Sequence, residues 1–177
     1  MTAIRQPPTA VVTDDLSVLH DLLAEFPVVL LGTFEQHGPQ PSLRARPMSV
    51  ARLEDDCTLY FISPIETEKV QEAEATGSAH AFGQSKTRFF TLRGTIELTQ
   101  DRQLLAELFS KLNDAWLDGP DDPRASVLIL RPIEAELWDV SGTKGLKFLF
   151  DAAKALATGT KLGPSDREQH MKVRASG

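Results

Sequence analysis

The sequence predicts a mainly β protein, with six or seven antiparallel strands forming a small barrel and helices at its periphery. Short runs rich in β-branched and aromatic residues recur along the chain. Short polar turns join most of these runs into hairpins, which produce antiparallel pairs. Helical periodicity is confined to four segments. Many strands with few helices are typical of a small barrel, and 177 residues are enough for one core.

The first third of the chain is expected to form an arm, a helix and three strands. Residues 1–13 contain two prolines and little pattern, so we expect a flexible N-terminal arm before one domain at 14–160. Asp14 or Asp15 can cap a helix with apolar residues on one side, and Pro27 ends it. The strands are expected at 28–34, 42–53 and 58–62.

A second helix is predicted from Ser63 to about residue 75. Ser63, Pro64 and Glu66 fit a capping box, with the serine at N-cap, the proline at N1 and the glutamate at N3. Gly77 is placed to end this helix in the left-handed conformation that glycine tolerates.

The remaining chain is expected to alternate strands with helices. Asp101 begins a third helix, which we extend to Leu112, and Pro132 marks a bulge or an edge in the last strand. The strands are expected at 78–82, 88–98, 126–130 and 134–138, a loop at 116–123, a helix at 144–157 and a polar tail at 161–177.

Composition excludes several classes of protein. The net charge of −6 argues against a protein whose task is to hold nucleic acid, which usually needs a basic face. The single cysteine, Cys57, excludes an intrachain disulfide, and the four histidines show no metal-ligand spacing, so we expect no metal site. No apolar run approaches the roughly 20 residues of a membrane helix. A cytoplasmic protein without a membrane partner is therefore expected.

Two neighbouring segments could hold a phosphate. Arg44 and Arg46 are two residues apart on a strand, so both side chains point to one face. Thr67 and Lys69 lie at the start of the second helix, where free N–H groups and the helix dipole favour an anion. The alternative is that the arginines are solvated and the helix start is only a cap. Glu68 suits the dipole but repels a phosphate unless it points away.

The chain resembles the pyridoxamine-phosphate-oxidase-like flavin-binding split-barrel family, in particular its bacterial general stress protein branch. The resemblance spans roughly residues 14 to 160 and depends on four segments in order. They are Thr33 to Met48, with the arginines near its end; Leu59 to Lys69; Phe89 to Asp101; and Ala135 to Asp139.

The resemblance implies a flavin mononucleotide (FMN) site, with FAD as an alternative, at the interface of a homodimer. The family's flavin contacts correspond here to Arg44, Ala45, Arg46, Pro47, Met48, Ser49, Ile62, Ser63, Thr67, Lys69 and Trp138. Glu68 departs from the basic residue of the family's phosphate-binding run, and Arg46 is expected to compensate. We assign Trp116, in the loop after the third helix, to packing or to the rim of the dimer interface.

The resemblance leaves several functions open. A flavin-dependent oxidoreductase acting on an unknown small molecule, with a nicotinamide as electron donor, is our first interpretation. The Arg-Leu-His substrate signature of the true oxidase is absent, so pyridoxamine phosphate is not the expected substrate. A non-catalytic flavin binder for storage or stress response is the alternative. Haem-binding and deazaflavin-dependent relatives are further, less favoured readings, and we assign no catalytic residue.

Overall fold

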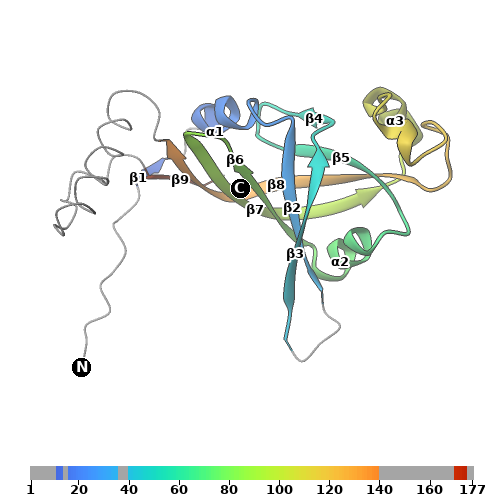
Figure 1. Cartoon of the computed structure of the whole chain (residues 1–177), viewed down its shortest axis with the longest axis horizontal. Coiled ribbons are helices and arrows are strands. Elements are labelled where there is room, and N and C mark those ends of the chain that lie inside the picture. The colour runs from blue at the N-terminus through green and yellow to red at the C-terminus, as the bar shows by residue number, and fades with distance from the viewer. Residues whose placement is uncertain (1–10, 14–15, 36–39, 140–169, 175–177) are drawn as a thin grey trace.

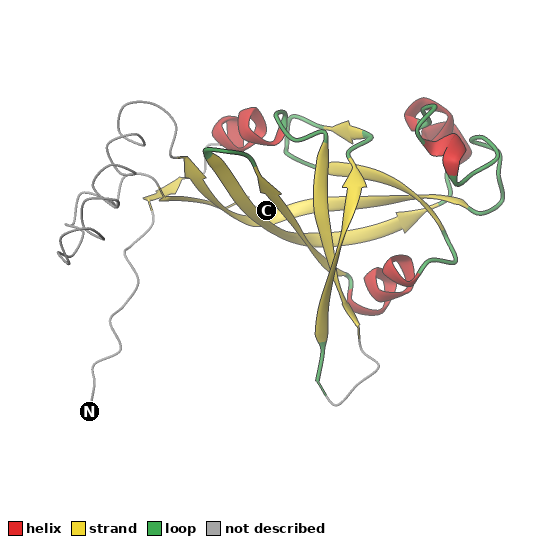
Figure 2. Ribbon diagram, viewed as in Figure 1, coloured by secondary structure: helices red, strands yellow, loops and turns green. Residues whose placement is uncertain are grey.

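A strongly curved β-sheet forms the centre of the molecule, with helices around it (Figure 1). The computed structural model describes residues 11–13, 16–35, 40–139 and 170–174. The helix expected at 144–157 lies outside these ranges. Within them the protein is mostly β, a curled antiparallel half-barrel with three peripheral helices, which confirms the predicted fold class (Figure 2).

Seven strands lie side by side in one continuous order, and two more lie off this path, attached through the third strand of the order. The order is β1 (Val11–Thr13), β9 (His170–Arg174), β8 (Ala125–Asp139), β7 (Arg88–Thr99), β6 (Ser78–Gln84), β2 (Val28–Glu35) and β3 (Ser42–Ser49). β5 (Leu59–Pro64) pairs with β8, and β4 (Arg52–Leu53) pairs with β5. All pairs are antiparallel except β1 with β9.

The strand expected at 42–53 is two strands. β3 follows β2 from Ser42 to Ser49, and the chain then changes partner. The Val50 N–H donates to the carbonyl of Pro27, whereas the Ala51 N–H donates to the carbonyl of Tyr60 on β5. The chain leaves β2 at this point and turns across to β5, so the end of β3 lies near β5.

β8 is a single 15-residue strand that spans both halves of the sheet. The bulge expected at Pro132 is confirmed, because the register with β7 shifts between Arg93 and Gly94, which lies opposite Pro132. Gly94 has a close-approach role here, since a Cβ atom at this position would lie 2.0 Å from the Arg131 carbonyl oxygen. From Ala125 to Leu130 every residue of β8 is buried.

The three described α-helices begin and end where local signals and tertiary contacts agree. α1 (Leu16–Leu23) buries three leucines against the sheet. α2 (Glu68–Thr76) starts four residues later than predicted, because Ser63 and Pro64 belong to β5 and Thr67 is the N-cap residue. Gly77 ends α2 in the left-handed conformation, as predicted, and its N–H donates to the carbonyl of Ala73.

α3 (Arg102–Leu108) is shorter than expected. Its predicted cap is confirmed, since the Asp101 side chain accepts a hydrogen bond of 3.0 Å from the Leu104 N–H. The helix ends at Leu108, so Leu112 is not part of it, and a 3₁₀ turn follows at Asn113–Ala115. Leu105, Leu108 and Leu117 pack with residues of β5 and β8 in a second, smaller hydrophobic cluster, which holds this segment beside the sheet. We call it the α3 cluster.

The two segments expected to be an arm and a polar tail each contain a strand. β1 and β9 pair with each other, and β9 continues the sheet beside β8. The physical reason lies in the alternation around Val173, which is buried, between Lys172 and Arg174, which form ion pairs with β8. In the described part of the chain, no helix is long and apolar enough to cross a membrane.

Candidate functional site

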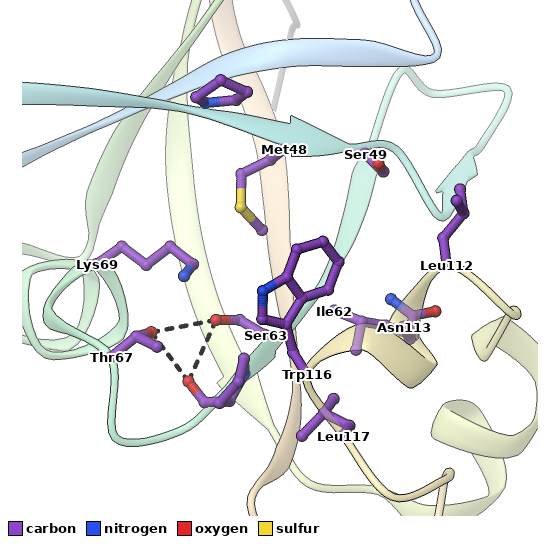
Figure 3. Close-up of a pocket in the computed structure, with 12 residues that line it drawn as sticks. Met48, Ser49, Ile62, Ser63, Thr67, Lys69, Leu112, Asn113, Trp116 and Leu117 are labelled. Carbon is purple, nitrogen blue, oxygen red and sulfur yellow. Dashed lines mark hydrogen bonds between the residues drawn. The ribbon is translucent and has the colours of Figure 1, made fainter.

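A pocket of about 390 Å³ opens where β3, β5 and the start of α2 converge (Figure 3). The segment after α3 forms its remaining wall. The lining residues are Pro47, Met48, Ser49, Ile62, Ser63, Pro64, Thr67, Lys69, Leu112, Asn113, Trp116 and Leu117. This volume is within the usual range for sites that bind small molecules and cofactors. We call this cavity the site pocket.

A tight turn from Ser63 to Thr67 forms one end of the site pocket. The Pro64 carbonyl accepts hydrogen bonds from the hydroxyl groups of Thr67, at 2.9 Å, and Ser63, at 3.2 Å. These two hydroxyl oxygens lie 3.1 Å apart, as the dashed lines of Figure 3 show. The Ser126 hydroxyl donates to the Ser63 carbonyl at 2.7 Å, which ties the turn to buried β8. The two hydroxyl groups are therefore fixed at the first turn of α2.

Lys69 supplies the positive charge of the site pocket. Its ammonium group extends into the cavity toward Ser63 and Met48 (Figure 3). Burial lowers its pKa below the ordinary value, and the nearby charge of Arg46 lowers it further. In the described ranges, no carboxylate forms an ion pair with this ammonium group. A half-buried cation without a counter-charge is an arrangement that favours binding of an anion.

Arg44 and Arg46 point to the same face of β3, as expected, but both guanidinium groups form ion pairs with Glu72 of α2. The Arg46 guanidinium donates to both oxygens of the Glu72 carboxylate, at 2.9 and 3.1 Å. Arg44 lies 3.5 Å from the same carboxylate, and the buried Thr33 hydroxyl donates to it. Burial favours a raised pKa for Glu72, but the bonds from Thr33 and Arg46 outweigh it and hold this pKa below its ordinary value.

Glu68 points away from the site pocket. Its carboxylate forms an ion pair of 2.8 Å with Arg44, and both residues line a separate pocket of about 270 Å³ on the other side of α2. The structure therefore separates the side chains considered for a phosphate site into two groups. Thr67 and Lys69 face the site pocket, whereas Arg44 and Glu68 do not. Arg46 does not line the site pocket, but its charge lowers the pKa of Lys69.

Seven of the eleven residues predicted from the resemblance line the site pocket. They are Pro47, Met48, Ser49, Ile62, Ser63, Thr67 and Lys69. Ala45, between the arginines, lines neither this cavity nor the one beside Glu68. Trp138 lines a third, apolar pocket of about 480 Å³ on the outer face of the sheet. Pro47 borders both this outer pocket and the site pocket.

Sequence reasoning missed the wall formed after α3. Leu112, Asn113, Trp116 and Leu117 line the site pocket, and Trp116 was assigned to packing or to a dimer rim. Trp116 is 67% exposed, so it is not a core residue. One local signal was available. Trp116 precedes Leu117, an apolar residue that packs in the α3 cluster, so the tryptophan must lie beside that cluster.

Comparisons with known proteins identify the family of this chain. Residues 14–163 match the sequence profile of the family described as pyridoxamine 5'-phosphate oxidase like. A protein named general stress protein 26, from Jannaschia sp. CCS1, is 28% identical and has a TM-score of 0.61, with 90% of this chain and 98% of that chain covered. No curated protein matches the chain.

Two further solved structures are similar in fold. The general stress FMN/FAD binding protein of Xanthomonas citri is 20% identical, with a TM-score of 0.59 over 74% of this chain and 93% of that chain. A pyridoxamine 5'-phosphate oxidase-related, FMN binding protein of Nostoc punctiforme PCC 73102 is 16% identical, with a TM-score of 0.52 over 73% and 85%. Because the sequence profile covers most of the chain and the strands form the corresponding split barrel, the protein belongs to the pyridoxamine 5'-phosphate oxidase-like family.

Proposed function

We propose that this protein binds flavin mononucleotide in the site pocket, with its phosphate at the start of α2. The observation that carries the proposal is Lys69, a half-buried cation with no described counter-charge beside the hydroxyl groups of Ser63 and Thr67. The first N–H groups of a helix have no partner within it and add donors for an anion. The ammonium group of Lys69 and these backbone N–H donors together suit a phosphate group.

The rest of the site pocket suits a planar ring. Met48, Ile62 and Trp116 offer apolar surface, and the cavity volume matches a ligand of cofactor size. The Xanthomonas citri and Nostoc punctiforme proteins carry flavin in their names, which supports the same cofactor class here. FAD is the alternative cofactor, because the Xanthomonas citri protein is described as an FMN/FAD binding protein.

We infer that a second copy of the chain completes the site. Val28, Leu30 and Leu43 are large apolar side chains that are 45–50% exposed on β2 and β3. Val28 and Leu30 line the outer pocket that contains Trp138, and Pro47 joins this pocket to the site pocket. A contiguous exposed apolar surface is typical of an interface between proteins. Trp138 can then reach the flavin of the partner subunit rather than its own.

A redox role on a small-molecule substrate is the finer part of the proposal. Bound flavin would supply hydride or electron transfer, and a nicotinamide is the donor we expect. The protein's own residues bind the phosphate, exclude water with Met48 and Ile62, and hold a positive charge at Lys69. Among the residues that the structure describes, no histidine lines the site pocket, so nothing in this lining favours the haem alternative. The cytoplasmic location stays a prediction.

Titration of the flavin-free protein with FMN tests the phosphate assignment. Lys69→Gln should weaken FMN binding by about 1.5–3 kcal/mol, since it removes a charged hydrogen bond, which is roughly ten- to a hundredfold in Kd. Lys86→Gln is the matched control, because Lys86 is an exposed lysine in the turn between β6 and β7. Unchanged affinity in Lys69→Gln would sink the phosphate assignment.

A second experiment tests the dimer and a third tests turnover. Leu30→Glu should convert the protein to a monomer on size-exclusion chromatography with light scattering and weaken FMN binding. Val18→Glu, on an exposed position of α1, is the control. A wild-type monomer with full affinity would contradict the shared site. Steady-state oxidation of a reduced nicotinamide by the flavin-loaded protein separates an oxidoreductase from a storage protein.

A further inference from the structure

The wall after α3 contains a tryptophan whose backbone is anchored but whose side chain is not buried. The Trp116 indole is 67% exposed, and it extends across the middle of the site pocket toward Met48 (Figure 3). The next residue, Leu117, is 3% exposed and packs in the α3 cluster. The backbone N–H groups of both residues donate to the Asn113 carbonyl, each at 3.0 Å.

The segment on the other side of Trp116 is fixed as well. The carboxylate of buried Asp122 accepts hydrogen bonds from the Asp118 N–H at 2.9 Å and the Arg124 N–H at 2.8 Å, and it pairs with the Arg124 guanidinium. The Arg102 side chain donates to the Asp122 carbonyl at 2.8 Å. The indole is thus an apolar plane presented by an anchored loop, and covering it releases water from its faces.

Asn113 presents a directed polar group from the same wall. The Ser110 N–H donates to the Asn113 Oδ1 atom at 2.9 Å, and the Ser110 hydroxyl lies 3.1 Å from that atom. A backbone N–H needs an acceptor, so the orientation of the amide is determined, and its Nδ2 atom remains as a donor. In Figure 3 this nitrogen lies on the side of Trp116. No described residue accepts a hydrogen bond from it.

We propose that Trp116 and Asn113 form the ring-recognition wall of the site pocket: the indole packs on the face of the flavin ring, and the Asn113 amide donates to a ring carbonyl. This inference rests on the proposed flavin function and deepens it. Lys69 lies at the opposite end of the same cavity, so the phosphate and the ring are bound by different elements. The contacts of the wall are therefore independent of the phosphate.

Comparing FMN with riboflavin, which lacks the phosphate, tests this division. Trp116→Ala should weaken binding of both flavins by the same factor, about tenfold, as expected for loss of one aromatic contact. Trp116→Phe keeps an aromatic face and should stay within about threefold of the wild-type protein. Lys69→Gln should weaken FMN and leave riboflavin unchanged, so the ratio of the two Kd values shifts only in that variant.

Asn113→Asp isolates the polar contact. It keeps an acceptor for Ser110 but replaces the donor with a charged oxygen that repels a ring carbonyl, so both flavins should bind at least tenfold more weakly. Gln103→Glu, which adds the same charge on the exposed side of α3, is the control and should change neither Kd.

Three results would overturn the ring-recognition wall. One is unchanged affinity of Trp116→Ala for both flavins; another is weakening of FMN alone, which would place Trp116 near the phosphate. A loss of affinity that tracks a change from dimer to monomer would also overturn it, since Trp116 would then be a dimer contact. If the wild-type protein binds neither flavin, the proposed function itself fails, which is a distinct outcome.

Discussion

Replacing Glu72 by glutamine should lower the free energy of unfolding by about 2–3 kcal/mol, because it breaks a charge network that holds α2 on β3. The Glu72 side chain is 8% exposed and contacts Arg46, Arg44 and Thr33. Loss of one partner of a fully buried ion pair costs roughly 3–5 kcal/mol. Arg46 is 24% exposed, so solvent screens part of that cost. Arg44 keeps Glu68 as a partner, whereas Arg46 is left with Thr33 and its own strand.

Urea unfolding of the flavin-free protein measures this loss, with the slope m expected to stay constant. Glu74→Gln is the matched control, since Glu74 is an exposed residue of the same helix. A loss below about 1 kcal/mol in Glu72→Gln, no larger than for an exposed ion pair, would refute the view that this carboxylate holds the two elements together.

The same network gives a pH dependence with a defined sign. The pKa of Glu72 is lower in the folded protein than its ordinary value, so the unfolded state binds the proton more tightly. The stabilisation from this group is complete above the unfolded pKa of about 4.3. It is lost as the pH falls from there through the folded pKa. The difference in stability between wild type and Glu72→Gln should therefore shrink below about pH 4, and a difference that grows on acidification would contradict the assignment.

Three further changes test other parts of the structure. Gly94→Ala should lower the free energy of unfolding by about 1–3 kcal/mol, because the new Cβ would lie 2.0 Å from the Arg131 carbonyl oxygen; an unchanged urea midpoint would argue against the close approach. Cys57 is fully buried and burial raises the pKa of its thiol to about 11, so alkylation by iodoacetamide at pH 8 should be slow until urea unfolds the chain. Asp122→Asn should lower Tm, because the buried carboxylate holds the loop behind the site pocket, while the exposed neighbour change Asp121→Asn should leave Tm unaltered.

Local signals in the sequence were enough to predict most of the fold. Asp101 and Gly77 cap helices through hydrogen bonds to residues close in the sequence. The bulge at Pro132 follows from the missing N–H of this proline. The predicted start of α2 was wrong, although Ser63 and Pro64 fit a capping box. Long-range hydrogen bonds determine the conformation of these two residues, because the Ser126 hydroxyl of β8 donates to the Ser63 carbonyl and keeps the segment extended.

The candidate site was predictable only in part, for the same reason. Met48, Ser63 and Lys69 follow from the resemblance, and all of them line the site pocket. The neutralisation of Arg46 was not predictable, because Glu72 is 26 residues away and its direction depends on how α2 crosses the sheet. The wall with Trp116 was missed because a loop pattern does not indicate which cavity the loop will border.

The length of β8 has a consequence for synthesis of the chain on the ribosome, which delivers the N-terminal part first. β5 carries Ser63, and among the described strands its only partners are the two-residue β4 and β8. β5 therefore lacks a stable partner until Leu130 has emerged, and such distant pairing is slow to form. The nascent chain can complete β2, β3 and β6 well before the site pocket exists, so the proposed flavin can bind only late in the synthesis of this protein.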